Sequence, residues 1–459
     1  MDWSKMDSKK IDLFENSSIP LAVAKLSVPA VMSTIVMVIY SLADTYFVGC
    51  LKSQTESSAV TLAAPALLAF NAVTNLFGVG GSSLMSRCLG SREYDKVKKT
   101  SSFCFYISLG LALLISLSVF IFNTPFLHLL GAEASNIDAT RKYVFWTVIL
   151  GAIPAIGNVI LSNIIRSEGE SLHASVGVIS GCILNIVLDP IFVWPKFIGM
   201  GAAGAGCATF VSNLIACIYI LGVMFVKRKK LVVTINPKYF RFDGQIIKGV
   251  LSVGVPAAIQ NLLNVTGTLI LNRFTGKYGV AAVTAMGNAH RVNMLPLYLT
   301  MGMTQGIMPL ISYNYSNGNI KRMKKAILFV LSLSVVIAVA LTAVIYAGSE
   351  KFIRVLLNDE EVVMHGTVLL REMSLGILFL AVDFMAVAVF QAIGKGIYSL
   401  IFAILRKIVL EIPAIVILNM IIPLYGMGYA QVVSEAVLSV AALLMLVKIF
   451  KQENKEMTQ

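Results

Sequence analysis

The sequence predicts an all-α integral membrane protein with twelve transmembrane helices in two similar six-helix lobes. Of the 459 residues, 57% are apolar and 13% are charged, and the mean hydropathy is +0.81, whereas soluble domains are about 45–50% apolar and about 25% charged. The apolar residues come in blocks of about 20 or more, the length that a helix needs to cross a bilayer. The sequence also repeats itself. This composition excludes a secreted disulfide scaffold, a disordered chain and an ordinary soluble enzyme.

The predicted spans follow the apolar blocks in chain order, and polar or charged segments separate one block from the next. The twelve spans are expected near residues 20–48, 58–86, 101–122, 142–165, 172–194, 201–226, 249–272, 279–313, 326–347, 366–393, 399–423 and 427–447. The six cysteines lie in or beside these spans without the spacing of metal ligands, so we interpret them as small buried hydrophobic residues.

The net charge of +13 is explained by membrane topology. With the N-terminus inside, the inner segments hold 25 of the 37 lysines and arginines, the outer segments hold nine, and three fall within spans. Because basic residues are enriched in cytoplasmic loops, both termini are expected in the cytoplasm. We therefore expect a multi-pass protein of the cell (plasma) membrane whose basic residues face anionic lipid. We expect a monomer and no nucleic-acid partner.

An internal repeat divides the chain into two halves. Residues 29–49 align without gaps over residues 256–276 with six of 21 positions identical, and residues 204–212 match residues 426–434. Each half holds an even number of spans, so both halves enter the membrane in the same direction, which is one of the known transporter architectures. Two such lobes suit alternating access, in which a central cavity opens first to one side of the membrane and then to the other. The expected division is an N-lobe at 1–226, a cytoplasmic linker at 227–248 and a C-lobe at 249–459.

Two aspartates within the spans are the strongest candidates for a functional site, because ionisable groups in a membrane are costly. Asp44 and Asp189 lie in spans that run outward, each four or five residues before the outer end, which places both about 7 Å below the outer boundary. Tyr40 and Asn185 precede them by one turn on the same helix faces, and Thr209 enters this layer from the next span. These oxygen-bearing groups suit a hard cation such as Na⁺, or a carboxylate pair that shares a proton.

Other ionisable residues within the spans have structural explanations. Arg406, Lys407 and Glu411 lie within about a turn of each other and can neutralise one another, with Lys407 and Glu411 at positions i and i+4. An ion pair with a basic residue is enough to explain Glu435 within a span, without a role in transport. We therefore do not include these residues in the predicted site.

Five motifs in the appropriate spans also resemble a known family. The sequence is similar to the multidrug and toxic compound extrusion (MATE) family over essentially its whole length, in particular to the bacterial branch with DinF-like and MepA-like exporters. The motifs are YSLADTYFVG at 40–49, MSRCLGSREYDKVKK at 85–99, LNIVLDPIFV at 184–193, GAGCAT at 204–209 and FQAIGKG at 390–396. The resemblance implies a V-shaped pair of six-helix bundles that exports drugs and organic cations in exchange for Na⁺ or H⁺, with no other cofactor.

The resemblance also assigns roles to individual residues. Asp44, Asn185, Asp189 and Thr209, with Tyr40 nearby, fall on the cation-coupling positions of the family's N-lobe, and Pro29 falls where DinF-like members bend their first helix. The C-lobe departs from the pattern of NorM-like relatives. Asn264 stands where those relatives carry a glutamate, and Asp383 is offset by about one residue from their acid in span 10. Coupling is therefore placed in the N-lobe, without a choice between Na⁺ and H⁺.

Substrate contacts are expected from both lobes. Met37 lies one turn before Tyr40 on the same helix face, and methionine adapts to varied ligand shapes. Asn158 in span 4 is a further candidate. In the C-lobe, Gln260, Asn264 and Asp383 are the polar groups expected to line a cavity, although helix–helix hydrogen bonding is an equal alternative for Gln260 and Asn264.

Two other functions are alternatives to the export of drugs. A flippase for lipid-linked oligosaccharides could use the same fold, but it would need a cavity rich in arginine and lysine to hold a pyrophosphate. A polytopic membrane enzyme would need a catalytic constellation, whereas the four histidines fall in four separate segments and no GxSxG, HExxH or P-loop motif is present. The sequence therefore predicts a secondary transporter that is not an enzyme.

Overall fold

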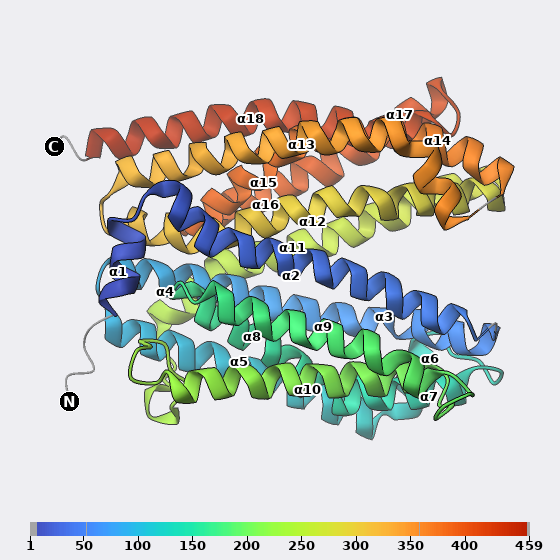
Figure 1. Ribbon diagram of the computed structural model, residues 1–459, viewed down its shortest axis with the longest axis horizontal. Coiled ribbons are helices and arrows are strands. Elements are labelled where there is room, and N and C mark those ends of the chain that lie inside the picture. Colours follow the sequence, from blue (N-terminus) through green and yellow to red (C-terminus); the bar gives the residue numbers. More distant parts are fainter. Residues whose placement is uncertain (1–6, 52, 358, 457–459) are drawn as a thin grey trace. The chain divides into compact units, whose positions relative to one another are not determined.

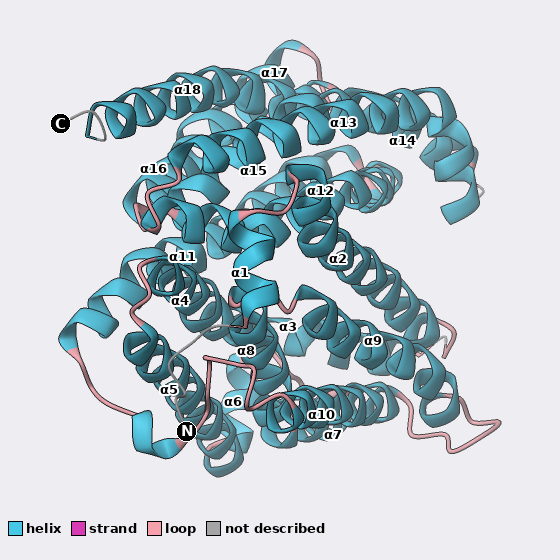
Figure 2. Cartoon of the chain, turned by 60° about the vertical axis from the view of Figure 1, so that its left-hand side comes forward, coloured by secondary structure: helices cyan, strands magenta, loops and turns pink. Residues whose placement is uncertain are grey.

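The computed structural model describes residues 7–51, 53–357 and 359–456. Every regular element within these residues is a helix (Figure 2). Nine of the described helices are long and apolar enough to cross a membrane, and two bent helix pairs pass the same test, which gives up to eleven spans. The remaining expected span, 399–423, is covered by three short helical segments that follow one another directly.

The first repeat contains ten α-helices, several of them interrupted (Figure 1). They are α1 (Ser8–Glu15), α2 (Ile19–Gly49), α3 (Gln54–Thr74) continued by the π-helical η1 (Asn75–Val79) and α4 (Gly80–Gly90), α5 (Tyr94–Ile121), α6 (Asn123–Leu129), α7 (Ile137–Val144) continued by the π-helical η2 (Phe145–Leu150) and α8 (Ala152–Ser167), α9 (Ser171–Val193) and α10 (Ala202–Val226).

The linker contributes a short 3₁₀ turn, η3 (Pro237–Tyr239), and the second repeat follows. Its elements are α11 (Gly244–Thr275), the 3₁₀ turn η4 (Gly276–Tyr278), α12 (Val280–Ser316), α13 (Ile320–Leu356), α14 (Glu360–Leu375), α15 (Ile377–Ala392), α16 (Gly396–Ile404), the π-helical η5 (Leu405–Glu411), α17 (Ile412–Ile421) and α18 (Gly426–Glu456).

The fourth span of each repeat is bent, by 44° between η2 and α8 and by 45° between α14 and α15. The break falls at Gly151 in the first repeat and at Gly376 in the second. A Cβ atom at Gly151 would lie only 2.3 Å from the Thr147 carbonyl oxygen. Glycine is therefore required there, because the backbone carbonyl closes on the position that a side chain would occupy.

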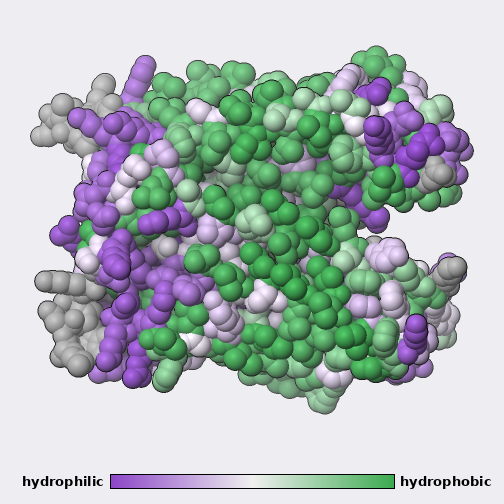
Figure 3. All heavy atoms as spheres, in the orientation of Figure 1, coloured by the Kyte–Doolittle hydropathy of each residue, from purple (hydrophilic) through white to green (hydrophobic). Residues whose placement is uncertain are grey.

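Side chains along the middle of the helices are hydrophobic, and hydrophilic side chains gather at the helix ends (Figure 3). Many large apolar side chains are exposed, for example Leu114 at 60% and Phe120 at 62% on α5. Exposed apolar surface on this scale is typical of a protein that faces lipid. Hydrocarbon also forces the backbone to satisfy its own hydrogen bonds, which explains the purely helical architecture of the described residues.

By their internal contacts the residues form two compact units, and these differ from the two repeats in one respect. Unit 1 comprises residues up to Asn16 and residues 32–258, and unit 2 comprises residues 17–31 and 259–459. The first membrane-spanning helix of each repeat, α2 or α11, is therefore divided between the two units. The beginning of α2 packs with the second repeat, and the beginning of α11 packs with the first. The divisions follow Pro29 and Pro256 by two residues, so the same position of the repeat is used twice.

The linker packs against unit 1 through its backbone. The hydroxyl groups of Ser101 and Ser102 donate to the Thr234 carbonyl at 2.8 and 3.1 Å, and the Tyr106 hydroxyl donates to the Ile235 carbonyl at 2.7 Å. All three donors lie on α5. The segment expected to be a linker at 227–248 is therefore fixed to unit 1 over these residues.

A fully buried carboxylate, Glu168 in the turn after α8, organises this end of unit 1. One oxygen accepts from Lys10 Nζ of α1 at 2.9 Å, and both oxygens accept from the backbone of the linker at Val232 and Val233, at 2.9–3.0 Å. Glu170 lies 3.4 Å from the Lys10 ammonium and 2.9 Å from that of Lys227. Burial would raise the pKa of Glu170, but these two ammonium groups outweigh burial, so its pKa lies below the usual value.

We expect Glu168→Ala to destabilise the protein, because the ammonium of Lys10 would then remain buried without its main partner. The expected cost is about 3–5 kcal/mol, the range for breaking a buried ion pair. The measurement is the melting temperature of the purified protein in detergent. Glu133→Ala, which removes an exposed carboxylate of the same unit, is the control. Equal melting temperatures for the two variants would contradict the role of Glu168.

Candidate functional site

The five residues expected to couple a cation come from three helices of unit 1. Tyr40 and Asp44 lie on α2, Asn185 and Asp189 on α9, and Thr209 on α10. Each pair on one helix is separated by four residues and therefore shares a face. The helices α9 and α10 pack extensively against each other, and this packing brings Asn185 beside Thr209.

Hydrogen bonds join these residues into one network. With the amide of Asn185 oriented so that its N–H group faces the carboxylate, Nδ2 donates to Oδ2 of Asp189 at 2.8 Å and the amide oxygen accepts from the Thr209 hydroxyl at 3.2 Å. A carboxylate only accepts, which favours this orientation. The Tyr40 side chain lies near that of Thr209. The polar groups of the site thus extend from α2 through α10 to the carboxylate on α9.

The two carboxylates differ in their surroundings. Asp189 is 0% exposed, and its second oxygen, Oδ1, has no hydrogen-bond partner within the described residues. Asp44 is half-buried and lies close enough to Asp189 for the two to interact electrostatically. No lysine or arginine of the described chain forms an ion pair with either carboxylate. Two acidic groups therefore share a low-dielectric site without a basic partner.

A sixth residue near the site, Tyr143 on α7, was not predicted from the sequence. It is 4% exposed and interacts electrostatically with Asp44, Asp189 and Tyr40. No motif surrounds Tyr143, and it begins a span whose bend could not be predicted. The one feature that could have indicated Tyr143 is its position one residue past the expected start of span 4, which places it near the outer boundary of the membrane.

The chemistry of this site is that of two carboxylates surrounded by neutral oxygens. Within the described residues no three or more histidine, cysteine, aspartate or glutamate side chains form a metal cluster, so a transition-metal centre finds no ligands there. Carboxylate, amide and hydroxyl oxygens are ligands for a hard monovalent cation. Two neighbouring carboxyl groups can equally share one proton.

Two of the expected substrate contacts lie in unit 1. Met37, on α2, has an exposed fraction of 37%. Asn158, on α8, is 6% exposed, and its Nδ2 donates to Oδ1 of Asn213 at 3.4 Å. Asn213 in turn donates to the Thr209 carbonyl at 3.0 Å. Asn158 is therefore connected to the coupling network through one residue.

The other expected contacts lie in unit 2. Gln260 and Asp383 line a cavity of about 10 Å³, enough for about one water molecule. Arg406 also lines it and forms an ion pair with Glu435. Asn264 is half-buried on α11 and does not line this cavity. The sequence did not indicate that Arg406 lies beside Asp383 and Glu435.

The predicted neutralisation among Arg406, Lys407 and Glu411 is confirmed in part. Lys407 Nζ lies 2.7 Å from Oε1 of Glu411, at the predicted spacing of four residues. Arg406 instead pairs with Glu435 on α18. The π-helical turn η5 accounts for the difference, because it alters the angular spacing between residues on the helix.

A family model for MatE matches the chain twice, over residues 29–191 and 256–417. The chain belongs to the MatE family. The two matches begin at Pro29 and Pro256, which confirms the predicted internal repeat. As a member of the MatE family, the chain is a multi-pass membrane transporter and not an enzyme.

Individual relatives match this chain over nearly its whole length. It is 30% identical to a multidrug export protein MepA of Staphylococcus saprophyticus over 442 residues and 29% identical to one of Staphylococcus aureus over 443, with 96% of both chains covered in each case. A solved multidrug resistance MATE family transporter in an outward-facing conformation is 25% identical and superimposes with a TM-score of 0.91, covering 98% of this chain and 100% of the other. A MATE protein solved in a straight conformation gives the same values.

We expect Asn185→Ala to lower the melting temperature, because Asp189 Oδ2 and the Thr209 hydroxyl would each lose a buried partner. A buried polar group left unpaired costs about 1–3 kcal/mol. Asn163→Ala is the matched control, since Asn163 is a half-buried asparagine of the same unit that donates to the Val159 carbonyl in its own helix. If both variants melted at the same temperature, the network would not be stabilising.

Proposed function

We propose that this protein is a secondary active exporter of organic, mainly lipophilic cationic compounds, antiported against Na⁺ or H⁺ in the plasma membrane. The observation that carries the proposal is the site in unit 1, where Asp44 and Asp189 have no basic partner among the described residues. Membership of the MatE family and the names of the MepA relatives support export of drugs. The distribution of basic residues supports cytoplasmic termini.

Coupling follows from the charge of this site. When Asp44 and Asp189 are both ionised and empty, the site is negative and attracts an organic cation. A sodium ion or proton at the pair cancels that charge and removes the attraction. The two ligands therefore lower each other's affinity, and such linkage is reciprocal by thermodynamic necessity. Ion binding from outside would release the drug, and drug binding from inside would release the ion.

Asn185, Thr209 and Tyr40 have the role of completing the oxygen shell around the bound cation. Their hydrogen bonds fix the side chains before the ion arrives, so less ordering is required on binding. Tyr143 adds a fourth polar neighbour, and its burial beside both carboxylates supports the same role.

Alternating access would use the divided helices. Pro29 and Pro256 lie two residues before the points where α2 and α11 pass from one unit to the other. A proline removes a backbone hydrogen bond and lets a helix bend. We propose Pro29 as the hinge through which occupancy of the site changes the course of α2.

Drug contacts are proposed at residues of both units. Met37 and Asn158 are the candidates in unit 1, and Gln260, Asn264 and Asp383 are those in unit 2. Met37 is supported by its exposure and its position one turn from Tyr40. Gln260, Asn264 and Asp383 are proposed from the sequence alone, because the cavity beside Gln260 and Asp383 holds only about one water molecule.

We expect Asp44→Asn and Asp189→Asn each to abolish gradient-driven export, and the double variant to be little worse than either alone, because the pair acts as one binding unit. The measurement is efflux of a cationic dye from proteoliposomes, first with an imposed sodium gradient and then with an imposed proton gradient. Asp95→Asn is the control, because Asp95 is an exposed carboxylate paired with Lys99 at 2.6 Å.

The gradient that drives the wild type identifies the coupling ion. Normal export by Asp189→Asn under that gradient would place coupling elsewhere and refute the mechanism. Export of anionic dyes without export of cationic dyes would refute the proposed substrate class.

We expect Met37→Ala to change the relative resistance of cells to different compounds rather than to reduce all of them equally, because a flexible apolar contact matters more for some shapes than for others. Met32→Ala is the control. Met32 is also exposed on α2, but five residues away it points to a different face of the helix. An unchanged resistance profile at equal expression would contradict a role of Met37 in drug binding.

A further inference from the structure

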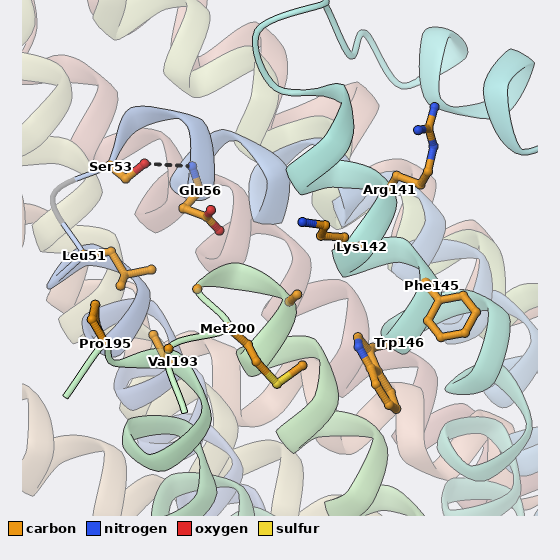
Figure 4. A pocket seen from close by; sticks show the side chains of 13 residues that line it. Leu51, Ser53, Glu56, Arg141, Lys142, Phe145, Trp146, Val193, Pro195 and Met200 are labelled. Carbon is orange, nitrogen blue, oxygen red and sulfur yellow. Dashed lines mark hydrogen bonds between the residues drawn. The ribbon is translucent and has the colours of Figure 1, made fainter. Parts of the chain in front are cut away.

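A second cavity, unrelated to the predicted residues, lies at one end of unit 1. Its volume is about 800 Å³, within the range of small-molecule sites. It is surrounded by the end of α2, the beginning of α3, the segment α7–η2 and the loop from α9 to α10 (Figure 4). Several helices begin or end around it, so the cavity lies at the level where the spans reach the membrane surface.

The walls of this cavity are mainly apolar. Trp146 packs against Phe210 with ring centroids 5.8 Å apart and ring planes at 46°, and Met200 and Val193 continue the apolar surface. The rim is apolar as well. In the loop between α9 and α10, next to residues that line the cavity, Phe197 is 57% exposed and Ile198 is 55% exposed. Exposed apolar side chains at the ends of membrane spans are suited to contact with lipid.

Three charged residues of the described chain line the cavity, and two of them have partners. Arg141 turns away from the cavity, to Asp138 at 3.1 Å and Asn123 at 3.2 Å (Figure 4). Glu56 accepts from the Ala202 N–H at 2.6 Å, which places its negative charge at the positive N-terminus of α10. A Cβ atom at Gly201 would lie 2.7 Å from Glu56 Oε2, so glycine leaves room for this contact.

Lys142 is the remaining charge. Its ammonium points into the cavity (Figure 4), and no carboxylate lies within 4.0 Å of it in the part of the chain that the structure describes. The cavity thus combines an ammonium group that has no ion-pair partner in the described chain with apolar walls and an apolar rim. A ligand that satisfies all three features carries an anionic group and an apolar body.

We propose that this cavity binds an anionic phospholipid of the surrounding leaflet, with the headgroup phosphate beside Lys142 and the glycerol and upper acyl chains against Trp146 and Met200. A basic group in a pocket between helices is a known chemistry for lipid headgroups. A lipophilic cation would fit the apolar walls but would face the Lys142 ammonium, so it is the disfavoured occupant. The proposal does not depend on the coupling site.

The test uses the purified, delipidated full-length protein in an uncharged detergent, with short-chain phosphatidylglycerol and phosphatidylcholine of equal chain length as probes. Phosphatidylglycerol is expected to raise the melting temperature at lower concentrations than phosphatidylcholine. Lys142→Gln is expected to weaken phosphatidylglycerol binding about fivefold, the effect of one basic residue near a membrane surface, and to leave phosphatidylcholine binding unchanged. Lys196→Gln is the control, since Lys196 is exposed in the neighbouring loop and does not line the cavity.

Met200→Trp, which fills the cavity, is expected to weaken binding of both lipids while the unliganded protein keeps its helical circular dichroism. Milder filling by Met200→Phe provides a second variant if the tryptophan does not fold. Retained preference of Lys142→Gln for phosphatidylglycerol would overturn the proposal. Equal stabilisation by glycerol phosphate would show that the ligand is a soluble anion, and stabilisation by ethidium that Met200→Phe removes would show a cation site; either result would also overturn it.

Discussion

The constraint on which the rest of the site depends is that Asp189 is a fully buried carboxylate with no basic partner among the described residues. Ionised and alone in a low-dielectric environment, such a group is strongly unfavourable, so it must take up a proton or hold a cation. Its neighbours fit that requirement. Asn185 donates to one oxygen, and the other oxygen is left without a partner in the described chain. That free oxygen, with Asp44 nearby, is what makes the site responsive to an ion.

The two repeats share an architecture but not a charge distribution. Both bend their fourth span by about 45°, and both divide their first helix two residues after a proline. The acidic groups differ, because the repeat aligns Asp44 with Leu271. The same arrangement of helices therefore holds an acidic site in unit 1 and a different polar cluster in unit 2. The fold sets the positions of the helices, and the side chains at equivalent positions determine which repeat can bind a cation.

The sequence predicted the helical spans and the repeat because both depend on local composition, which a bilayer constrains strongly. It also predicted the grouping of Asp44 and Asp189, since depth in the membrane follows from counting residues along a helix. It did not predict Tyr143, Glu168 or the pairing of Arg406. Glu168 contacts Lys10 and the linker, and Arg406 contacts Glu435, so these partners are distant in the sequence and neither periodicity nor composition indicates them.

The comparison between Asp189 and Asp383 supports coupling in unit 1. Asp383 is also buried, at 2% exposed, but it interacts with Arg406 as well as with Glu435. Lys407 and Glu411 next to them form a pair of their own. The arginine gives this cluster a positive charge of its own, which offsets part of the negative charge and lowers the need for an external cation. Asp189 and Asp44 have no such group. Of these two acidic clusters, the one in unit 1 therefore has the greater requirement for an ion from solution. A site with that requirement is one whose occupancy an ion gradient can control.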